Sequence, residues 1–222
     1  MTLRVLVIND DAFELATLSA ALRLHTINVV GEAKNLAVAE SLFRSLQPEV
    51  LVIDIQFDGQ EAVTLVKKLR KLNPALGIVL TTACPDLRLL NIASKDVPNG
   101  TQLILKKSIS NLEVIAESVL KSALVADSNS PVMWVDSHGS LHENAFTSIL
   151  GAMTDTQIET LRLVATGLSN AEIGRVRYVS EKSVEQIVAR IAVHFAIAPD
   201  RTRNLRVLIA GQYYKWIGAP RH

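Results

Sequence analysis

Residues 153–195 read MTDTQIETLRLVATGLSNAEIGRVRYVSEKSVEQIVARIAVHF, and this stretch decides how the chain is organised. It contains two helix-start signals. In Thr154-Asp-Thr-Gln157 a hydroxyl and an amide three residues later can each bind a backbone N–H that the helix leaves without a partner, and Ser169-Asn-Ala-Glu172 repeats the pattern. Gly167 follows the first apolar series and suits the left-handed residue that often ends a helix. The stretch therefore predicts short helices joined by tight turns.

A third helix is predicted after the turn at residues 177–180. One set of its residues recurs at helical spacing and is apolar: Val184, Ile187, Val188, Ile191 and Phe195. The remaining positions are mostly polar and point outward: Lys182, Glu185, Gln186, Ala189 and Arg190. This arrangement is a helix-turn-helix whose last helix has an exposed face.

The segment Gly167-Leu-Ser-Asn-Ala-Glu-Ile173, followed by Val179-Ser-Glu-Lys-Ser-Val184, resembles the DNA-binding domain of LuxR/NarL/FixJ-type transcription factors over residues 153–222. The resemblance implies that the third helix contacts double-stranded DNA. The DNA-binding residues would be Lys182, Ser183, Glu185, Gln186, Ala189, Arg190 and Arg177. It also implies a homodimer on DNA, with the fourth helix supplying Leu205, Leu208, Ile209 and Tyr213 as dimer contacts. A small helical bundle that uses these faces for packing alone is the alternative.

Composition sets limits on the rest of the chain. The 222 residues are 49% hydrophobic and 20% charged, which is typical of a globular protein with room for two modest domains. No apolar run is long enough to span a membrane, the N-terminus lacks a secretory pattern, and the single Cys84 excludes an intramolecular disulfide. We therefore expect a cytoplasmic protein. Residues 154–222 hold ten Lys/Arg and six Asp/Glu, a modest basic surplus that fits phosphate contact.

Strands and helices alternate along the first 124 residues. Apolar runs of the kind buried on both faces of a parallel sheet occur at 4–8, 27–31, 48–54, 77–82 and 103–106. Helical patterns follow near 13–24, 36–46, 60–72 and 111–124. Five βα units imply an α/β doubly wound, five-stranded parallel sheet of flavodoxin-like type, followed by an all-α four-helix helix-turn-helix domain. The expected domains are 1–124 and 153–222, joined by a linker, 125–152, in which Asp136 to Gly139 closes a short hairpin.

Polar side chains mark the ends of four of these strands. Asp10, Asp54, Thr81 and Lys106 each fall at or just past the C-terminal tip of a different strand, and the fold would bring them to one rim. Two carboxylates there suit a hard divalent cation such as Mg²⁺, which keeps several waters. A cation, a lysine and a hydroxyl around Asp54 are what phosphoryl transfer requires, namely positioning and charge neutralisation.

Residues 1–124 resemble the receiver domain of two-component response regulators, and a receiver followed by a LuxR-type domain resembles the NarL/FixJ class. The resemblance implies that Asp54 is the phosphoacceptor, served by a sensor histidine kinase. Thr81 would be the switch hydroxyl and Lys106 the phosphate-binding residue. The metal ligands would be Asp10, Asp54, the Gln56 backbone carbonyl and, through a water, Asn9. The implied function is a DNA-binding transcriptional regulator controlled by phosphorylation of Asp54, and not an enzyme.

Several residues depart from the receiver pattern. Asn9 stands where the family has an acid, the loop after Asp54 is about three residues shorter than usual, Leu103 replaces a common aromatic residue, and Lys107 replaces a proline or acid. Three alternatives follow. The protein is a regulator that works without phosphorylation, an interaction module whose helical domain binds another protein, or a phosphatase with Asp54 as nucleophile.

Overall fold

The structure is a computed structural model that describes residues 2–56, 59–108, 111–126, 130–135, 141–142, 148–198 and 200–217. Its contacts divide the chain into two units. The first consists of residues 1–83 and 92–144, and the second of residues 84–91 and 145–222. Among the helices that the structure describes, none combines the length and the apolar character that crossing a bilayer requires.

The first unit is built on a sheet. Its strands are β1 (Arg4–Ile8), β2 (Asn28–Ala33), β3 (Val50–Asp54), β4 (Gly77–Thr82), β5 (Gln102–Leu105), β6 (Met133–Val135) and β7 (Leu141–His142). They lie in the order β2-β1-β3-β4-β5-β6-β7, and every neighbouring pair is parallel except β6 with β7. The order reverses between β1 and β3, which is the point where ligands gather in doubly wound sheets. The predicted parallel α/β fold is confirmed.

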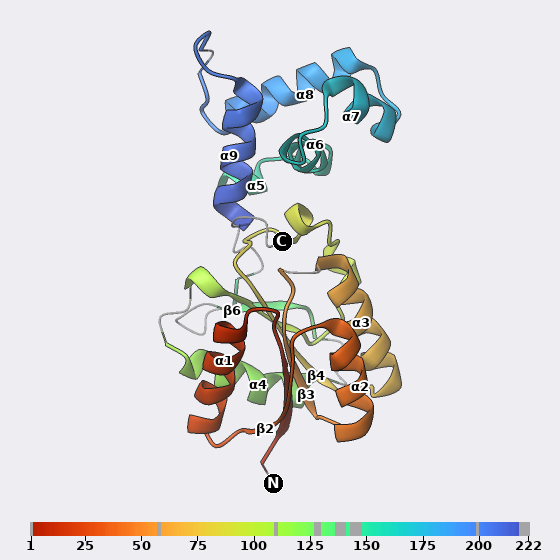
Figure 1. The fold of residues 1–222 in the computed structure, drawn as a ribbon, viewed down its shortest axis with the longest axis vertical. Coiled ribbons are helices and arrows are strands. Elements are labelled where there is room, and N and C mark those ends of the chain that lie inside the picture. Colours follow the sequence, from red (N-terminus) through yellow and green to blue (C-terminus); the bar gives the residue numbers. More distant parts are fainter. Residues whose placement is uncertain are drawn as a thin grey trace. The chain divides into compact units, whose positions relative to one another are not determined.

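Helices cover both faces of this sheet (Figure 1). Helices α1 (Ala12–Leu24) and α4 (Glu113–Val125) lie on one face, and α2 (Leu36–Leu46) and α3 (Gly59–Leu72) on the other. Strands β3 and β4 are buried along their whole length because alternate residues point to opposite faces and both faces are covered. All five residues of β3 are buried, for example.

The sheet is larger than predicted, and no α-helix lies between β4 and β5, where every residue is described. Five strands were expected, but Met133–Val135 from the predicted linker pairs with β5 and covers an edge that would otherwise expose backbone N–H and C=O groups. The antiparallel β6–β7 pair flanks the predicted hairpin, whose turn lies outside the described residues. Between β4 and β5 the chain forms two 3₁₀ turns, η1 (Leu87–Leu90) and η2 (Ser94–Asp96), so the count of five βα units was wrong.

The second unit is helical. It contains α5 (Ser148–Gly151), α6 (Asp155–Ala165), α7 (Asn170–Arg177), α8 (Glu181–His194) and α9 (Leu205–Ile217). Its core is formed by residues at helical spacing on α6, α8 and α9, including Leu161, Ile191 and Ile209, all fully buried. The four predicted helices are confirmed as α6 to α9, close to their expected bounds.

The segment 84–91 leaves the sheet after β4 and packs in the helical unit. Leu89 is fully buried in the helical core, and its carbonyl accepts a hydrogen bond from the Tyr213 hydroxyl (3.2 Å). The guanidinium of Arg88 donates to the carbonyls of Leu150 (2.9 Å) and Met153 (3.0 Å) and pairs with the buried Asp86. These bonds make the segment a structural part of the helical unit, a feature that the sequence did not predict.

Candidate functional site

The strand register brings the predicted rim residues together. Asp54 at the end of β3 is directly opposite Thr81 on β4, and the two strands stay bonded beyond this pair because the Ile55 N–H donates to the Thr81 carbonyl (3.0 Å). Asn9 follows β1, the neighbour of β3 on its other side. Lys106 follows β5 and begins a single 3₁₀ turn, η3 (Lys106–Ser108). Of the predicted rim residues, Asp54, Thr81 and Lys106 therefore sit at the carboxyl ends of adjacent strands, and Asn9, the neighbour of the predicted Asp10, follows β1 at the same edge.

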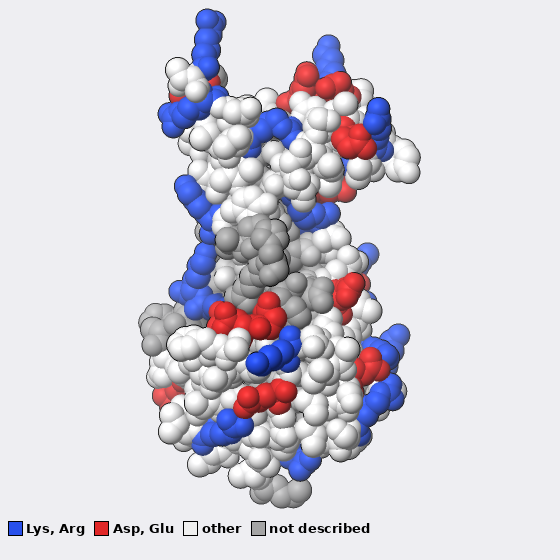
Figure 2. Space-filling view, viewed as in Figure 1, with Lys and Arg blue, Asp and Glu red and all other residues white. Residues whose placement is uncertain are grey.

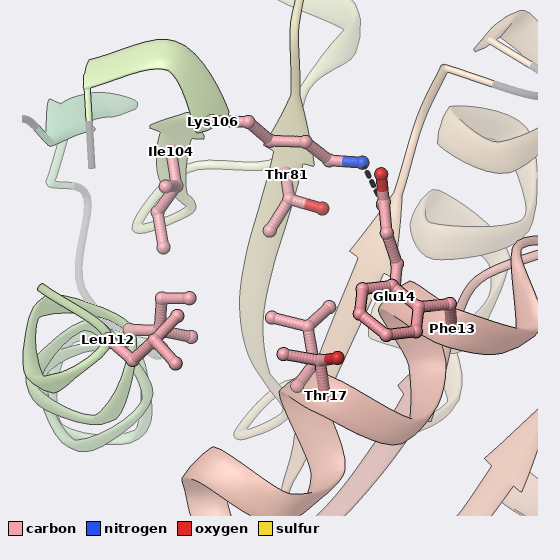
Figure 3. A pocket seen from close by; sticks show the side chains of 9 residues that line it. Phe13, Glu14, Thr17, Thr81, Ile104, Lys106 and Leu112 are labelled. Atoms are coloured by element: carbon pink, nitrogen blue, oxygen red, sulfur yellow. Dashed lines mark hydrogen bonds and ion pairs between the residues drawn. The ribbon is translucent and has the colours of Figure 1, made fainter. Parts of the chain in front are cut away.

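Lys106 lies between two carboxylates. Its ammonium donates to Asp54 Oδ2 (2.8 Å) and also to Glu14 Oε2, and Figure 3 shows the lysine and Glu14 pointing toward one another. The side-chain amide of Asn9 donates to the same Glu14 oxygen (2.9 Å). One connected set of hydrogen bonds thus joins Asn9 after β1, Glu14 of α1, Asp54 of β3 and Lys106 after β5.

Burial has the largest effect on the ionisation of Asp54, a residue that is only 1% exposed to solvent. Removal of water raises the pKa of the Asp54 carboxyl above its usual value, and the negative charge of Glu14 acts in the same direction. The ammonium of Lys106 and the backbone N–H of Gln56 oppose this increase because they stabilise the ionised form. The net shift is upward, so Lys106 only partly offsets the cost of burying the charge.

Thr81 and Lys106 stand over a cavity of about 190 Å³ between α1 and α4 (Figure 3). The remaining lining is mainly apolar: Phe13, Glu14, Thr17, Leu18, Ile104, Leu112 and Ile115. The Thr81 hydroxyl is buried and has no hydrogen-bond partner in the part of the chain that the structure describes. A buried hydroxyl without a partner is costly, and an incoming oxygen would satisfy it.

The donors at the rim fit a hard cation only with help from water and backbone. Among the described residues, no three carboxylate, histidine or cysteine side chains gather closely enough to hold a metal ion by themselves. The amide oxygen of Asn9 accepts from the Asp11 N–H (2.8 Å), so it is already bonded. Mg²⁺ prefers oxygen ligands and keeps several waters. The ligands that would suit it here are the carboxylates of Asp10 and Asp54 and the backbone carbonyl of Gln56, completed by waters.

The side chain of Gln56 has a role that was not predicted. The side-chain amide oxygen Oε1 of Gln56 accepts from the Ala83 N–H (2.7 Å). The backbone N–H of Gln56 donates to Asp54 Oδ1 (3.0 Å). Gln56 therefore connects the carboxylate of Asp54 to the residue after β4 that immediately precedes the segment 84–91. Leu103, which stands where the family commonly has an aromatic residue, is fully buried within β5.

The second candidate site is the helix-turn-helix, whose start signals the structure reproduces. Thr154 and Gln157 form the predicted reciprocal cap of α6, and Gly167 has a left-handed φ of 87°. Ser169 caps α7, but the side chain of Glu172 pairs with Arg175 and does not complete the second box. These caps fix where each helix begins and so orient α8.

The turn between α7 and α8 depends on Gly174. A Cβ on this residue would lie 2.8 Å from the Val179 carbonyl oxygen, closer than real contacts allow. The Val179 N–H donates to the Gly174 carbonyl (2.9 Å), and Tyr178 adopts a left-handed φ of 56°. The close approach sets the tight turn that the sequence predicted without identifying this glycine as its cause.

The outward face of α8 is as predicted. Most of its proposed DNA-binding residues are exposed: Lys182, Glu185, Gln186, Ala189 and Arg190. Ser183 is half-buried and bonds to Ser180, the N-cap of the helix (2.8 Å between hydroxyls). On the face seen in Figure 2, basic and acidic groups of the helical unit are interspersed, in keeping with the modest basic surplus.

Three predicted contact residues have other tasks. Arg177, assigned to DNA, is only 10% exposed; it pairs with Glu159 (2.9 Å) and donates to the Thr160 hydroxyl (2.9 Å), holding α7 to α6. Ile209 and Tyr213, assigned to a dimer contact, are buried in the core of their own unit, and burial raises the pKa of the Tyr213 hydroxyl to about 12. The dimer-contact assignment of Ile209 and Tyr213 does not fit their burial, because sequence spacing marks an apolar face without showing what covers it. Leu205 and Leu208 remain half-buried.

The family model for the response regulator receiver domain matches residues 5–118. The chain belongs to the response regulator family. A receiver followed by a LuxR-type helical unit makes it a two-component response regulator of the NarL/FixJ class, as the two resemblances implied.

Relatives of this response regulator match over nearly its whole length. Response regulator protein VraR of Staphylococcus aureus strain Mu3 is 27% identical over 207 residues, which covers 91% of this chain and 94% of the relative. VraR of Staphylococcus saprophyticus is 24% identical over 204 residues with the same coverage. The order of the two units is therefore shared with these proteins.

Solved structures show the same two-unit fold. The structure of RcsB from Salmonella enterica serovar Typhimurium, bound to a promoter in the presence of phosphomimetic BeF₃⁻, has a TM-score of 0.57 at 17% identity and covers 98% of this chain and 100% of that one. A structure of two RcsB dimers bound to two parallel DNAs has a TM-score of 0.54 at 18% identity, with 97% and 98% covered. At these identities the likeness concerns the fold.

The main residue that sequence reasoning missed in this response regulator is Glu14. It lies in the first turn of α1, after the N-cap Asp11, where acids are common for helix-capping reasons alone. The signal that could have identified it is the combination with Asn9. An amide in place of an acid at the strand end can donate to a carboxylate one turn later, whereas an acid would repel it.

Proposed function

We propose that this chain is a DNA-binding transcriptional regulator whose Asp54 accepts a phosphoryl group, and that phosphorylation shifts the population able to bind DNA. The observation that carries the proposal is the convergence of Asp54, Thr81 and Lys106 at one rim, in a chain whose α8 has an exposed polar face. Family membership supports the same conclusion.

The chemistry at Asp54 is a displacement at phosphorus. A carboxylate oxygen of Asp54 forms a bond to the phosphorus of a phosphohistidine or a small acyl phosphate, and the bond from phosphorus to the donor atom breaks. Lys106 neutralises charge on the transferred oxygens, and the buried Thr81 hydroxyl, which lacks a partner among the described residues, donates to one of them. Bound Mg²⁺, held by Asp10, Asp54, the Gln56 carbonyl and a water on Asn9, would supply further charge neutralisation.

DNA contact is assigned to α8. Gln186 can pair with adenine and Glu185 can accept from cytosine in the major groove, while Lys182 and Arg190 reach phosphates or base edges. Ser183 and Ala189 complete the face. The complexes of RcsB with DNA support this assignment because the fold is shared. A homodimer on DNA, with contacts from Leu205 and Leu208, would present two such helices to half-sites.

The segment 84–91 would couple phosphorylation at Asp54 to DNA binding by α8. β4 carries Thr81 and leads through Ala83 into residues that are packed in the helical unit, where Leu89 and Arg88 are bonded. A phosphoryl oxygen that draws Thr81 inward would pull on this segment, and Gln56 would transmit movement of Asp54 to Ala83. The helical unit would then experience the change directly through its own core.

Intact mass measurement tests the phosphorylation. The chain incubated with acetyl phosphate and Mg²⁺ is expected to gain the mass of one phosphoryl group, and Asp54→Asn is expected to gain none. Absence of the added mass on the wild type, or the same gain on Asp54→Asn, would refute the assignment.

A regulator that works without phosphorylation is the second candidate. The observation in its favour is the carboxylate of Glu14 on Lys106, which gives the phosphate-binding residue an anionic partner without any phosphoryl group. Equal DNA affinity for the wild type and Asp54→Asn under phosphorylating conditions would favour this candidate.

A further inference from the structure

Glu14 occupies the position at Lys106 that an anionic ligand of the rim would take. The Lys106 ammonium contacts one oxygen of Asp54 and one of Glu14, so the two carboxylates share a single cation. The Glu14 side chain is 34% exposed, while that of Asp54 is fully buried. Glu14 comes from α1 and therefore approaches the lysine from outside the sheet, next to the Thr81 hydroxyl (Figure 3).

We propose that Glu14 is an internal competitor of the phosphoryl group: its carboxylate holds Lys106 in the resting receiver and must leave before a phosphoryl oxygen can bind. The inference rests on the proposed phosphorylation of Asp54. Two negative groups near one ammonium repel each other, and a phosphoryl group brings more charge than a carboxylate. Glu14 therefore disfavours phosphorylation in proportion to the time it spends on Lys106.

Asn9 makes this arrangement possible. Its amide N–H₂ donates to the Glu14 oxygen that Lys106 also contacts (2.9 Å). A carboxylate at residue 9 would repel Glu14, so the departure from the family pattern at residue 9 and the acid at residue 14 act as a pair. Asn9 also accepts from the Asp11 N–H, which fixes its orientation so that the amide nitrogen is directed at Glu14.

The partial exposure of Glu14 gives it a route away from Lys106. A buried acid would have to remain paired, but a half-exposed one on the first turn of a helix can turn into water and stay ionised. Displacement by a phosphoryl oxygen thus exchanges one anionic partner of Lys106 for another. Glu14 acts through Lys106 and does not touch the reacting atoms, so it is a positioning residue.

The test compares full-length variants in acetyl phosphate and Mg²⁺, with phosphoryl gain followed by intact mass over time. Glu14→Gln removes the charge at nearly constant shape, and Glu117→Gln on the exposed face of α4 is the matched control. We expect Glu14→Gln to gain phosphate roughly tenfold faster than the wild type because Lys106 loses its competing carboxylate partner, while Glu117→Gln behaves as the wild type. In a Lys106→Met background the Glu14 substitution should have no effect, because its action passes through the lysine.

A second readout does not require transfer. Beryllofluoride binding, followed by the shift in melting temperature, should be tighter in Glu14→Gln than in the wild type. Equal phosphorylation rates and equal beryllofluoride affinities would overturn the role of Glu14 and leave phosphorylation of Asp54 intact. If no variant gains phosphate but Glu14→Gln binds beryllofluoride more tightly, the proposed phosphorylation fails, and what remains is that Glu14 competes with a bound anion for Lys106. If no variant gains phosphate and all variants bind beryllofluoride equally, both the phosphorylation of Asp54 and the role of Glu14 are refuted.

Discussion

Charged side chains at the carboxyl end of the sheet are bonded within the protein, whereas those on the outer face of α8 are exposed to solvent. At the sheet end, Lys106 is held by two carboxylates, and in the segment that follows β4 the Arg88 guanidinium has four bonded partners. On the outer face of α8, Lys182, Glu185, Gln186 and Arg190 are exposed to solvent. The difference teaches that Lys106 at the sheet end and Arg88 in the segment 84–91 hold the structure through their bonds, whereas the exposed charges on α8 are available to a partner.

Substitution of Arg88 should have the largest effect on stability. Arg88→Met would leave the buried Asp86 carboxylate and two carbonyls without their donor, which should cost about 3 kcal/mol of unfolding free energy. Arg190→Met on α8 is the matched control and should change stability by less than about 0.5 kcal/mol. Denaturant unfolding of the helical unit measures both. Similar losses of stability for the two variants would contradict the distinction between the bonded arginine and the exposed one.

Lys106 should follow with a smaller loss. Lys106→Met keeps the length of the side chain but leaves Asp54 buried beside Glu14 without a cation, and we expect a cost of about 2 kcal/mol, reduced by the partial exposure of the lysine. Adding Asp54→Asn to this variant should recover most of the loss because no buried charge remains. Receiver unfolding followed by circular dichroism reports both steps. A double variant as unstable as Lys106→Met alone would contradict the role of the pair.

On α8 the expected effect lies in binding. Gln186→Ala should weaken binding to a duplex selected from a random-sequence library by about 1–3 kcal/mol if it pairs with a base, with stability unchanged within about 0.5 kcal/mol. Gln212→Ala on α9 is the control. Fluorescence anisotropy at two salt concentrations also shows whether affinity falls with ionic strength, as phosphate contact requires. Binding that is insensitive to both changes would favour a protein partner for this helix.

The smallest effect concerns pH. Burial raises the pKa of Asp54 in the folded chain, so the folded state favours the protonated form and the ionised form lowers stability. This contribution is present below the unfolded-state pKa of the carboxyl and is lost as pH rises through the folded value. Asp54→Asn should therefore be more stable than the wild type near neutral pH, with the gain shrinking in acid. A gain that grows as pH falls would show that the shift has the opposite sign.

Much of the fold could be predicted because it depends on local patterns. Continuous apolar runs identified the buried strands, and the Thr154 and Ser169 caps with Gly167 located the helices of the second unit. The pairing of Met133–Val135 with β5 was missed because β5 is distant in sequence and local patterns do not show which strands pair. The packing of residues 84–91 in the helical unit was missed for the same reason.

Some residues of the candidate site could be predicted from the sequence and others could not. Asp54, Thr81 and Lys106 were predictable because strand ends in a parallel sheet meet at one edge. Glu14 was not, because a first-turn acid has an ordinary role at helix starts and only its contact with Lys106 shows another. Ile209 and Tyr213 were misassigned because an apolar helical face reads the same whether a core or a partner covers it.

The DNA affinity of the full chain before and after phosphorylation is the most direct measurement of control from one region to the other. With acetyl phosphate and Mg²⁺, the wild type should bind its selected duplex at least roughly tenfold more tightly, a change of about 1.4 kcal/mol, and Asp54→Asn should show no change. An affinity of the wild type that is the same with and without a phosphoryl group confirmed on Asp54 would contradict that control.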